Sequence, residues 1–130
     1  MDGTRAGSLR YSVIIPAYNE GDLIGMCVGA LVEQSVPREQ YEVIVVDDAS
    51  TDGTAAVAAG AGADRVLTID HGGAAAARNA GLAAAAGELI LFTDADCAPC
   101  HEWIERMTSP FVEPLVVGVK GTYRTRQPNL

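Results

Sequence analysis

Aromatic and basic residues are scarce in this sequence of 130 residues. Only 5% of the residues are aromatic, so Val, Ile, Leu and Ala must fill any core, which the hydrophobic share of 48% allows. Nine Lys and Arg stand against 17 Asp and Glu, which gives a formal net charge of −8. Because nucleic-acid binding needs clustered Lys and Arg, this charge argues against a nucleic-acid partner. An anionic nucleotide remains compatible with it, because a bound metal ion inverts the local field.

Long apolar runs and a signal-peptide pattern are also missing. No uninterrupted apolar span in the sequence is long enough to cross a bilayer. The first residues do not have the charged, apolar and small-residue order of a signal peptide. Three cysteines, an odd number, fit a reducing compartment better than a disulfide framework. We therefore expect a cytoplasmic domain.

Three common cofactor motifs are absent or incomplete. Residues 16–20 read Pro-Ala-Tyr-Asn-Glu where a dinucleotide-binding fold has Gly-x-Gly-x-x-Gly, and there is no P-loop. The EF-hand-like start at Asp48 lacks its bidentate Glu, because the twelfth position is Ala59. Cys97–His101 formally matches a haem attachment sequence, but haem attachment requires export and a distal ligand. We interpret its two cysteines as free thiols beside a helix start.

Two kinds of apolar segment alternate along the chain. Short β-branched runs predict strands, and longer segments with apolar residues at helical spacing predict helices. The predicted strands are 11–16, 41–46, 65–69, 88–93 and 115–120, and the predicted helices are 20–34, 54–60, 74–86 and 99–107. Such alternation implies right-handed crossovers and a mostly parallel sheet between helices, which is an α/β fold. Residues 1–10 are polar and are predicted to be a flexible leader to one domain over 11–130.

Acidic residues follow three of the predicted strands. Glu20 follows the first, Asp47 and Asp48 follow the second, and Asp94 and Asp96 follow the fourth. In a parallel sheet these strand ends share one edge, where open α/β folds bind ligands. Five carboxylates at one place are costly without a cation or hydrogen-bond donors. Oxygen ligands of this kind suit Mg²⁺ or Mn²⁺, although an Asp-rich turn also fits a plain helix cap.

Three further features are each compatible with two interpretations. Gly72-Gly73, just before a predicted helix, fits a phosphate seat at the helix N-terminus and fits a plain turn equally well. Tyr18 fits a ring that stacks on a base and fits a half-buried loop aromatic. Arg78 interrupts an Ala-rich helix, which fits pairing with Asp48, with Asp94 or with a diphosphate, and also fits a solvated helix face.

Four stretches of the sequence occur in a characteristic order. They are Ser-Val-Ile-Ile-Pro-Ala-Tyr-Asn-Glu at 12–20, Val-Val-Asp-Asp-Ala-Ser-Thr-Asp-Gly-Thr at 45–54, Ala-Arg-Asn-Ala-Gly at 77–81 and Phe-Thr-Asp-Ala-Asp at 92–96. Together they resemble the family 2 glycosyltransferases of the GT-A fold, over about residues 12–123. The resemblance implies a Rossmann-like, mostly parallel sheet flanked by helices. It also implies an inverting transfer of sugar from a nucleotide-diphospho-sugar to an acceptor hydroxyl, with a UDP-sugar as the favoured donor.

The same resemblance implies roles for individual residues. Those implied to contact the donor are Pro16, Ala17, Tyr18, Glu20, Asp47, Asp48, Arg78, Asp94 and Ala95. Asp48 is expected to accept from a base N–H, and Asp47 to buttress the loop. Asp94-Ala95-Asp96 matches the family's Asp-x-Asp motif, in which Asp96 is expected to bind Mg²⁺ or Mn²⁺ and Asp94 to contact ribose or the metal.

The family's acceptor-binding half has no match in this sequence. Its catalytic base, an Asp within a Glu-Asp type motif, and its Gln-x-x-Arg-Trp element do not occur after Asp96. The resemblance therefore implies a fold truncated at the C-terminus, with the base beyond Leu130. Two alternatives are a non-catalytic nucleotide-binding module and a sugar-nucleotide nucleotidyltransferase. The second normally has a Gly-rich loop with Lys or Arg after its first strand, and this sequence lacks such a loop.

A truncated sheet is expected to expose an edge or an apolar face, which favours self-association. The chain alone is expected to bind nucleotide weakly at best and to transfer no sugar, because a base beside the acceptor hydroxyl is lacking. For a full-length protein the resemblance implies a sugar or lipid-linked acceptor, and hence a position at the cytoplasmic face of the membrane.

Overall fold

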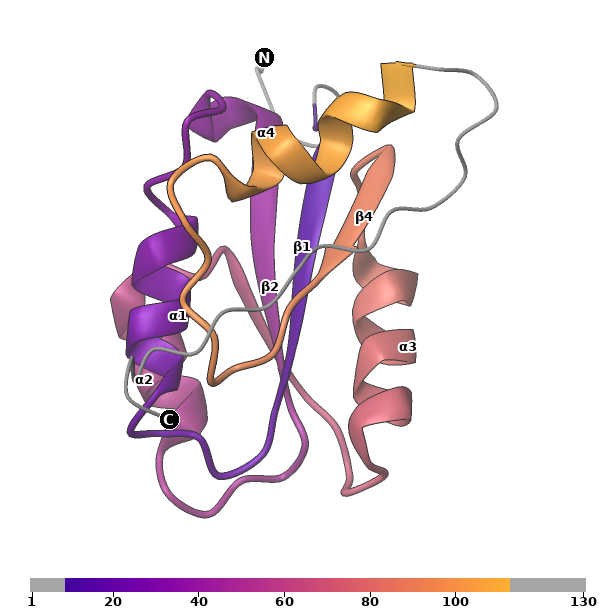
Figure 1. Cartoon of the computed structure of the whole chain (residues 1–130). Helices are drawn as coiled ribbons and strands as arrows, with labels where there is room; N and C mark the ends of the chain where they lie inside the picture. Colours follow the sequence, from indigo (N-terminus) through magenta and orange to yellow (C-terminus); the bar gives the residue numbers. More distant parts are fainter. Residues whose placement is uncertain (1–8, 113–130) are drawn as a thin grey trace, which may run out of the picture.

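One parallel sheet organises the chain, and a computed structural model describes it over residues 9–112 (Figure 1). Its strands are β1 (Tyr11–Ala17), β2 (Tyr41–Asp47), β3 (Arg65–Thr68) and β4 (Leu89–Phe92), in the order β3-β2-β1-β4. All three strand pairs are parallel. The helices are α1 (Ile24–Leu31), α2 (Thr54–Ala61), α3 (Ala74–Ala84) and α4 (Trp103–Thr108), with short 3₁₀ turns η2 (Arg38–Gln40) and η3 (Ser109–Val112). The predicted α/β fold with a mostly parallel sheet is confirmed.

Helices cover both faces of the two central strands (Figure 1). Odd-numbered residues of β1 and β2, such as Val13 and Val45, pack with side chains of α1, α2 and α4. Even-numbered residues, such as Ile14 and Val46, pack with Ala77 of α3 on the other face. Since neighbouring strand residues point to opposite faces, burial on both sides explains why these strands are almost continuously apolar. Among residues 9–112, no helix has the length and apolar character needed to cross a membrane.

A glycine sets the distance between α3 and the sheet. A Cβ added at Gly81 would lie 2.5 Å from Cγ2 of Ile14 and 3.2 Å from Cγ2 of Val46. Any side chain at this position would therefore push the helix away from β1 and β2. The glycine that interrupts the Ala-rich helix is thus a packing requirement, and the close contact places the first turn of α3 beside the ends of both strands.

A buried carboxylate fixes the connection from α3 to β4. Glu42, only 3% exposed, accepts hydrogen bonds from the Ser12 hydroxyl and from the Ala86 N–H, both at 2.7 Å. The Ser12 hydroxyl in turn accepts from the Gly87 N–H at 2.8 Å. Buried polar groups of this kind are retained when every member is hydrogen-bonded. The network holds the start of β4 against β1, at the end of the sheet opposite the strand ends that carry the acids.

Several predicted boundaries differ from the structure. The helix predicted from Glu20 begins at Ile24, and the one predicted from Pro99 begins at Trp103. The sheet continues through Pro16, which pairs with Val46. Pro16 has no N–H to donate, but none is needed on that side of β1. Its nitrogen faces the same side as Ile14, whose carbonyl accepts from the Thr93 N–H, and β4 has already ended there. The strand predicted over 115–120 lies outside the described residues.

The two residues that precede β1, Leu9 and Arg10, differ from the predicted flexible leader. The sequence assigns Leu9 and Arg10 to the leader, whereas in the structure both contact the domain. Leu9 is 8% exposed, and the Arg10 N–H donates to the Gln40 carbonyl at 2.8 Å.

Substitution of two helical glycines tests the packing argument. Gly81→Ala should lower the free energy of unfolding by about 1–3 kcal/mol, because the new methyl group overlaps Ile14. Gly29→Ala in α1 is the matched control: nothing lies within 4 Å of its added Cβ, so the change should be neutral or stabilise by up to about 1 kcal/mol. Urea denaturation of both variants measures the difference. Equal stability of the two variants would contradict close packing at Gly81.

Candidate functional site

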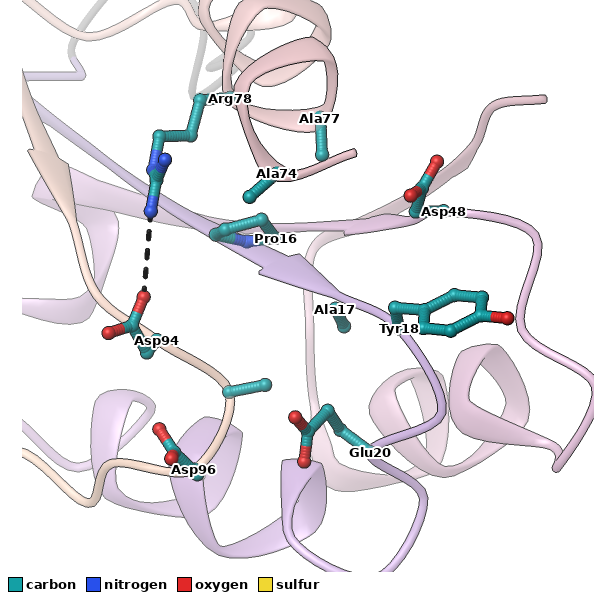
Figure 2. A pocket seen from close by; sticks show the side chains of 11 residues that line it. Pro16, Ala17, Tyr18, Glu20, Asp48, Ala74, Ala77, Arg78, Asp94 and Asp96 are labelled. Carbon is teal, nitrogen blue, oxygen red and sulfur yellow. Dashed lines mark ion pairs between the residues drawn. The ribbon is translucent and has the colours of Figure 1, made fainter. Parts of the chain in front are cut away.

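A cavity of about 370 Å³ lies at the carboxyl edge of the sheet (Figure 2). Loops that follow β1, β2 and β4 contribute to it, together with the first turn of α3. The lining residues are Pro16, Ala17, Tyr18, Glu20, Asp48, Ala74, Ala77, Arg78, Asp94, Ala95 and Asp96. The expectation that acids from three strand ends meet at one edge is therefore confirmed for four of the five, and Asp47 does not line the cavity.

Hydrogen bonds join the loop after β1 to the loop after β2. The Asp48 N–H donates to the Ala17 carbonyl at 2.9 Å, which extends the parallel ladder by one bond. The Asn19 N–H donates to the Ser50 hydroxyl at 2.8 Å, and the Asn19 side-chain oxygen accepts from the Thr51 N–H at 2.8 Å. Asn19 has a φ of 50°, a left-handed conformation that Asn tolerates well. These bonds hold Tyr18, the residue before Asn19, at the mouth of the cavity.

A second set of bonds fixes Glu20 and Gly21. The Glu20 N–H donates to the Thr54 hydroxyl at 3.0 Å, and the Gly21 N–H donates to Oδ2 of Asp52 at 3.0 Å. The Thr54 hydroxyl also donates to Oδ1 of Asp52. The pKa of Asp52 is held below its ordinary value, first by the Thr54 hydroxyl and then by the Gly21 N–H. A turn in which the Leu23 and Ile24 N–H groups both donate to the Glu20 carbonyl then leads into α1, which begins at Ile24.

Asp47 stabilises the loop that follows β2. It is 4% exposed, and its Oδ1 accepts from the Ser50 N–H at 3.0 Å. This hydrogen bond spans a turn that contains Ala49. The φ of Ala49 is 62°, which is uncommon for a residue other than glycine. Asp47 therefore acts on the cavity through the shape of the loop.

Asp48 is the most heavily hydrogen-bonded side chain of the cavity. Its side chain is almost inaccessible, and Oδ1 accepts from the Gly72 N–H at 2.7 Å while Oδ2 accepts from the Gly73 N–H at 2.9 Å. The pKa of Asp48 is lowered chiefly by the Gly72 N–H, against the opposing effect of burial, and further by Gly73 and His71. The phosphate seat considered for Gly72-Gly73 is wrong, because both N–H groups already donate to this carboxylate.

His71 is a residue of the site that the sequence analysis left out. Its Nδ1 lies 3.0 Å from Oδ2 of Asp48, and its ring centroid lies 4.8 Å from that of Tyr18. Its sequence context, His-Gly-Gly at 71–73, predicts only a turn. A signal was available, since this turn follows the strand predicted at 65–69, and the ends of parallel strands share one edge.

Carboxylates gather at the other end of the cavity. Asp94, Asp96 and Glu20 lie at this end in Figure 2, whereas Asp48 and Tyr18 lie at the opposite end. The pKa of Glu20 is raised, first by burial and then by the negative charges of Asp96, Asp52 and Asp94. Mutual repulsion of this kind is relieved by a cation, and oxygen donors suit Mg²⁺ or Mn²⁺. The residues present therefore fit a divalent metal.

Two further groups lie beside these acids. Arg78 approaches Asp94 with Nη2 at 3.7 Å from Oδ1, and both side chains are about half exposed, so this ion pair is loose. The Sγ of Cys97 lies within 4.8 Å of carboxylate oxygens of Asp94 and Asp96. Cys97 and Cys100 are free thiols, as expected, and His101 is engaged elsewhere, since its Nδ1 lies 2.6 Å from the Glu33 carbonyl oxygen.

Removal of one charge from the acidic end should stabilise the metal-free protein. Because the folded-state pKa of Glu20 lies above its ordinary value of 4.5, ionised Glu20 opposes folding. This cost is absent below the unfolded-state pKa and appears as the pH rises through the folded-state pKa. Glu20→Gln should therefore raise the melting temperature at pH 7 in EDTA, and the gain should shrink as the pH falls toward 4.5.

Thermal melts from pH 4 to pH 8 measure this difference. Glu39→Gln, at an exposed glutamate of η2, is the matched control and should change the melting temperature little. A pH-independent gain, or a loss of stability in Glu20→Gln, would contradict charge repulsion at the acidic end.

Comparison with known proteins places this geometry in a family. Residues 12–130 match the model of glycosyl transferase family 2. Among curated proteins, glycosyltransferase AglE of Haloferax volcanii is 37% identical over 123 residues, which cover 91% of this chain and 40% of AglE. The chain therefore spans less than half the length of this relative.

Solved structures agree with the sequence match. S. aureus TarS 1-349 in complex with UDP superposes with a TM-score of 0.73 at 31% identity, covering 80% of this chain and 32% of that one. The mannosyltransferase PcManGT from Pyrobaculum calidifontis, in complex with GDP-Man and Mn²⁺, gives a TM-score of 0.65 at 38% identity, covering 69% of this chain and 28% of that one. With its four-stranded parallel sheet and this match over nearly its whole length, the chain belongs to glycosyl transferase family 2 and has the GT-A fold.

Proposed function

We propose that the chain is the donor-binding part of an inverting glycosyltransferase that uses a nucleotide-diphospho-sugar, with a UDP-sugar favoured. One observation carries the proposal: the cavity has a group of carboxylates at one end and an aromatic ring beside a buried carboxylate at the other (Figure 2). A nucleoside diphosphate has a matching order of groups, with a diphosphate at one end and a base at the other. The complexes of TarS with UDP and of PcManGT with GDP-Man and Mn²⁺ support it.

The nucleobase is assigned to Tyr18 and Asp48. The Tyr18 ring is 48% exposed and is therefore available for stacking. Asp48, held ionised by its N–H donors, acts only as an acceptor. It therefore suits a base that presents an N–H on its pairing edge, as uracil does at N3. Pro16 and Ala17 complete the floor of this half of the cavity.

The diphosphate is assigned to the acidic end. Asp96, with Asp94, would hold Mg²⁺ or Mn²⁺, and Ala95 lies between them in the lining. When bound, the divalent cation supplies charge stabilisation to the diphosphate leaving group. Arg78, in its loose ion pair with Asp94, is placed to donate to diphosphate oxygens. Glu20 adds negative charge at the same end of the cavity, which strengthens the attraction for a cation.

Binding of the acceptor and removal of its hydroxyl proton are assigned to residues outside 9–112. Each carboxylate that lines the cavity within residues 9–112 has a donor or metal role in this proposal. We therefore propose that the general base belongs to a longer protein that contains this chain, with a sugar or lipid-linked acceptor at the cytoplasmic face of the membrane. A non-catalytic nucleotide-binding module is the second candidate, because no carboxylate that lines the cavity within residues 9–112 is left to serve as a general base. Self-association is also proposed, because β4 is an edge strand of the described sheet and Phe92 on it is 43% exposed.

Removal of the metal ligand tests the proposed donor site. UDP should bind the wild-type chain more tightly with Mn²⁺ than with EDTA, and Asp96→Ala should abolish this metal dependence while the fold is kept. Calorimetric titration with UDP in both conditions measures the effect. Asp22→Ala is the matched control, because Asp22 is an exposed acid just beyond the loop that follows β1. This variant should retain the metal dependence. Equal affinity for UDP with and without Mn²⁺ in the wild type would overturn the metal assignment.

An assay of sugar transfer separates the enzyme from the binding module. The 130-residue chain, incubated with UDP-sugar and a panel of sugar and lipid-linked acceptors, should release UDP no faster than without acceptor. Absence of a general base costs about 10²–10⁴-fold in rate. A longer natural protein that contains this chain should release UDP in an acceptor-dependent way. Robust turnover by residues 1–130 alone would contradict the assignment of the base to other residues, and an inactive longer protein would favour the binding module.

A further inference from the structure

His71 lies directly behind two residues of the nucleobase end, although it does not line the cavity itself. Its Nδ1 is 3.0 Å from Oδ2 of Asp48 and 3.4 Å from the Asp48 carbonyl oxygen. Its ring contacts the Tyr18 ring at a centroid distance of 4.8 Å and an interplanar angle of 43°. One side chain thus touches both the acceptor and the aromatic ring that the proposed function assigns to the base.

The contact between His71 and Asp48 limits where Asp48 can accept a further hydrogen bond. An ionised carboxylate has about four lone-pair sites. The N–H groups of Gly72 and Gly73 occupy one site on each oxygen, and His71 approaches a second site on Oδ2. With three donors in place, the remaining site belongs to Oδ1. The direction in which Asp48 can accept from a ligand is therefore fixed by His71 as well as by the backbone.

We propose that His71 is a positioning residue for nucleobase recognition, acting through Asp48 and Tyr18. The inference rests on the proposed donor-binding function. The neutral imidazole with its proton on Nδ1, or the imidazolium, donates to Oδ2 of Asp48 and leaves Oδ1 for the base N–H. The ring at the same time limits the rotation of Tyr18, so that less side-chain entropy is lost when a base stacks on it.

Two substitutions separate the hydrogen bond from the ring. Asn carries a side-chain N–H donor at the same number of bonds from the backbone as Nδ1 of His, but has no ring. Phe keeps a ring beside Tyr18 but has no donor. Because the His71 side chain is 62% exposed, both variants are expected to fold. The affinity for UDP with Mg²⁺ is measured by NMR titration, which also covers weak binding, for the wild type, His71→Phe, His71→Asn and His101→Phe.

The expected result is a ranked series. His71→Phe should weaken UDP binding by about three- to tenfold, since Asp48 loses a donor that orients it. His71→Asn should lie between the Phe variant and the wild type. His101→Phe, at the other histidine of the chain, should bind UDP as the wild type does. In an Asp48→Asn background, itself expected to bind UDP about tenfold more weakly, His71→Phe should cost less than twofold, because its effect passes through Asp48.

Three outcomes would overturn the inference. They are wild-type affinity in His71→Phe, no recovery in His71→Asn relative to Phe, and an undiminished effect of His71→Phe in the Asp48→Asn background. The last two would indicate a general structural role. Failure of the wild-type chain to bind UDP would instead refute the proposed function, so the two failures are distinguishable.

Discussion

The buried carboxylate of Asp48 is the constraint on which the candidate site depends. It directly follows β2, its own N–H donates to the Ala17 carbonyl of β1, and its side chain accepts from the N–H groups of Gly72 and Gly73, just before α3. One residue therefore ties together three segments that are distant in the sequence. Gly81 allows α3 to lie close to β1 and β2, because a Cβ at this position would overlap Ile14.

Charge is distributed unevenly along this cavity. At one end the carboxylates of Asp94, Asp96 and Glu20 lie together, and the pKa of Glu20 is raised first by burial and then by these and other negative charges. At the other end the charge of Asp48 is compensated by hydrogen bonds, and its pKa is lowered. The same residue type thus serves two purposes: uncompensated carboxylates attract a cation, whereas a compensated one is a fixed acceptor for a neutral N–H group. This contrast is what distinguishes a metal and diphosphate half from a base half in the proposed function.

Much of this arrangement follows from the sequence, and the exceptions have physical causes. Apolar β-branched runs predicted all four described strands, and parallel connectivity then predicted that Glu20, Asp48, Asp94 and Asp96 would meet at one edge. Helix starts were less predictable: α1 begins at Ile24, after a segment whose Glu20 and Gly21 N–H groups donate to Thr54 and Asp52, more than thirty residues away. Likewise, no local pattern shows that the N–H groups of Gly72 and Gly73 are used by Asp48, or that His71 meets Tyr18. These contacts are set by tertiary structure and could not be read from residue type and spacing.

The most direct test of a metal and nucleotide site at this edge is paramagnetic broadening by Mn²⁺ in the amide NMR spectrum, recorded with UDP present. The account predicts the strongest broadening at residues 94–96 and at Glu20. It predicts a UDP-dependent shift, with weaker broadening, at Gly72 and Gly73, whose N–H groups report on Asp48. Residues around Glu42 and Ser12, at the opposite end of the sheet, should remain sharp. Broadening centred away from residues 94–96, or no response of Gly72 and Gly73 to UDP, would contradict the account.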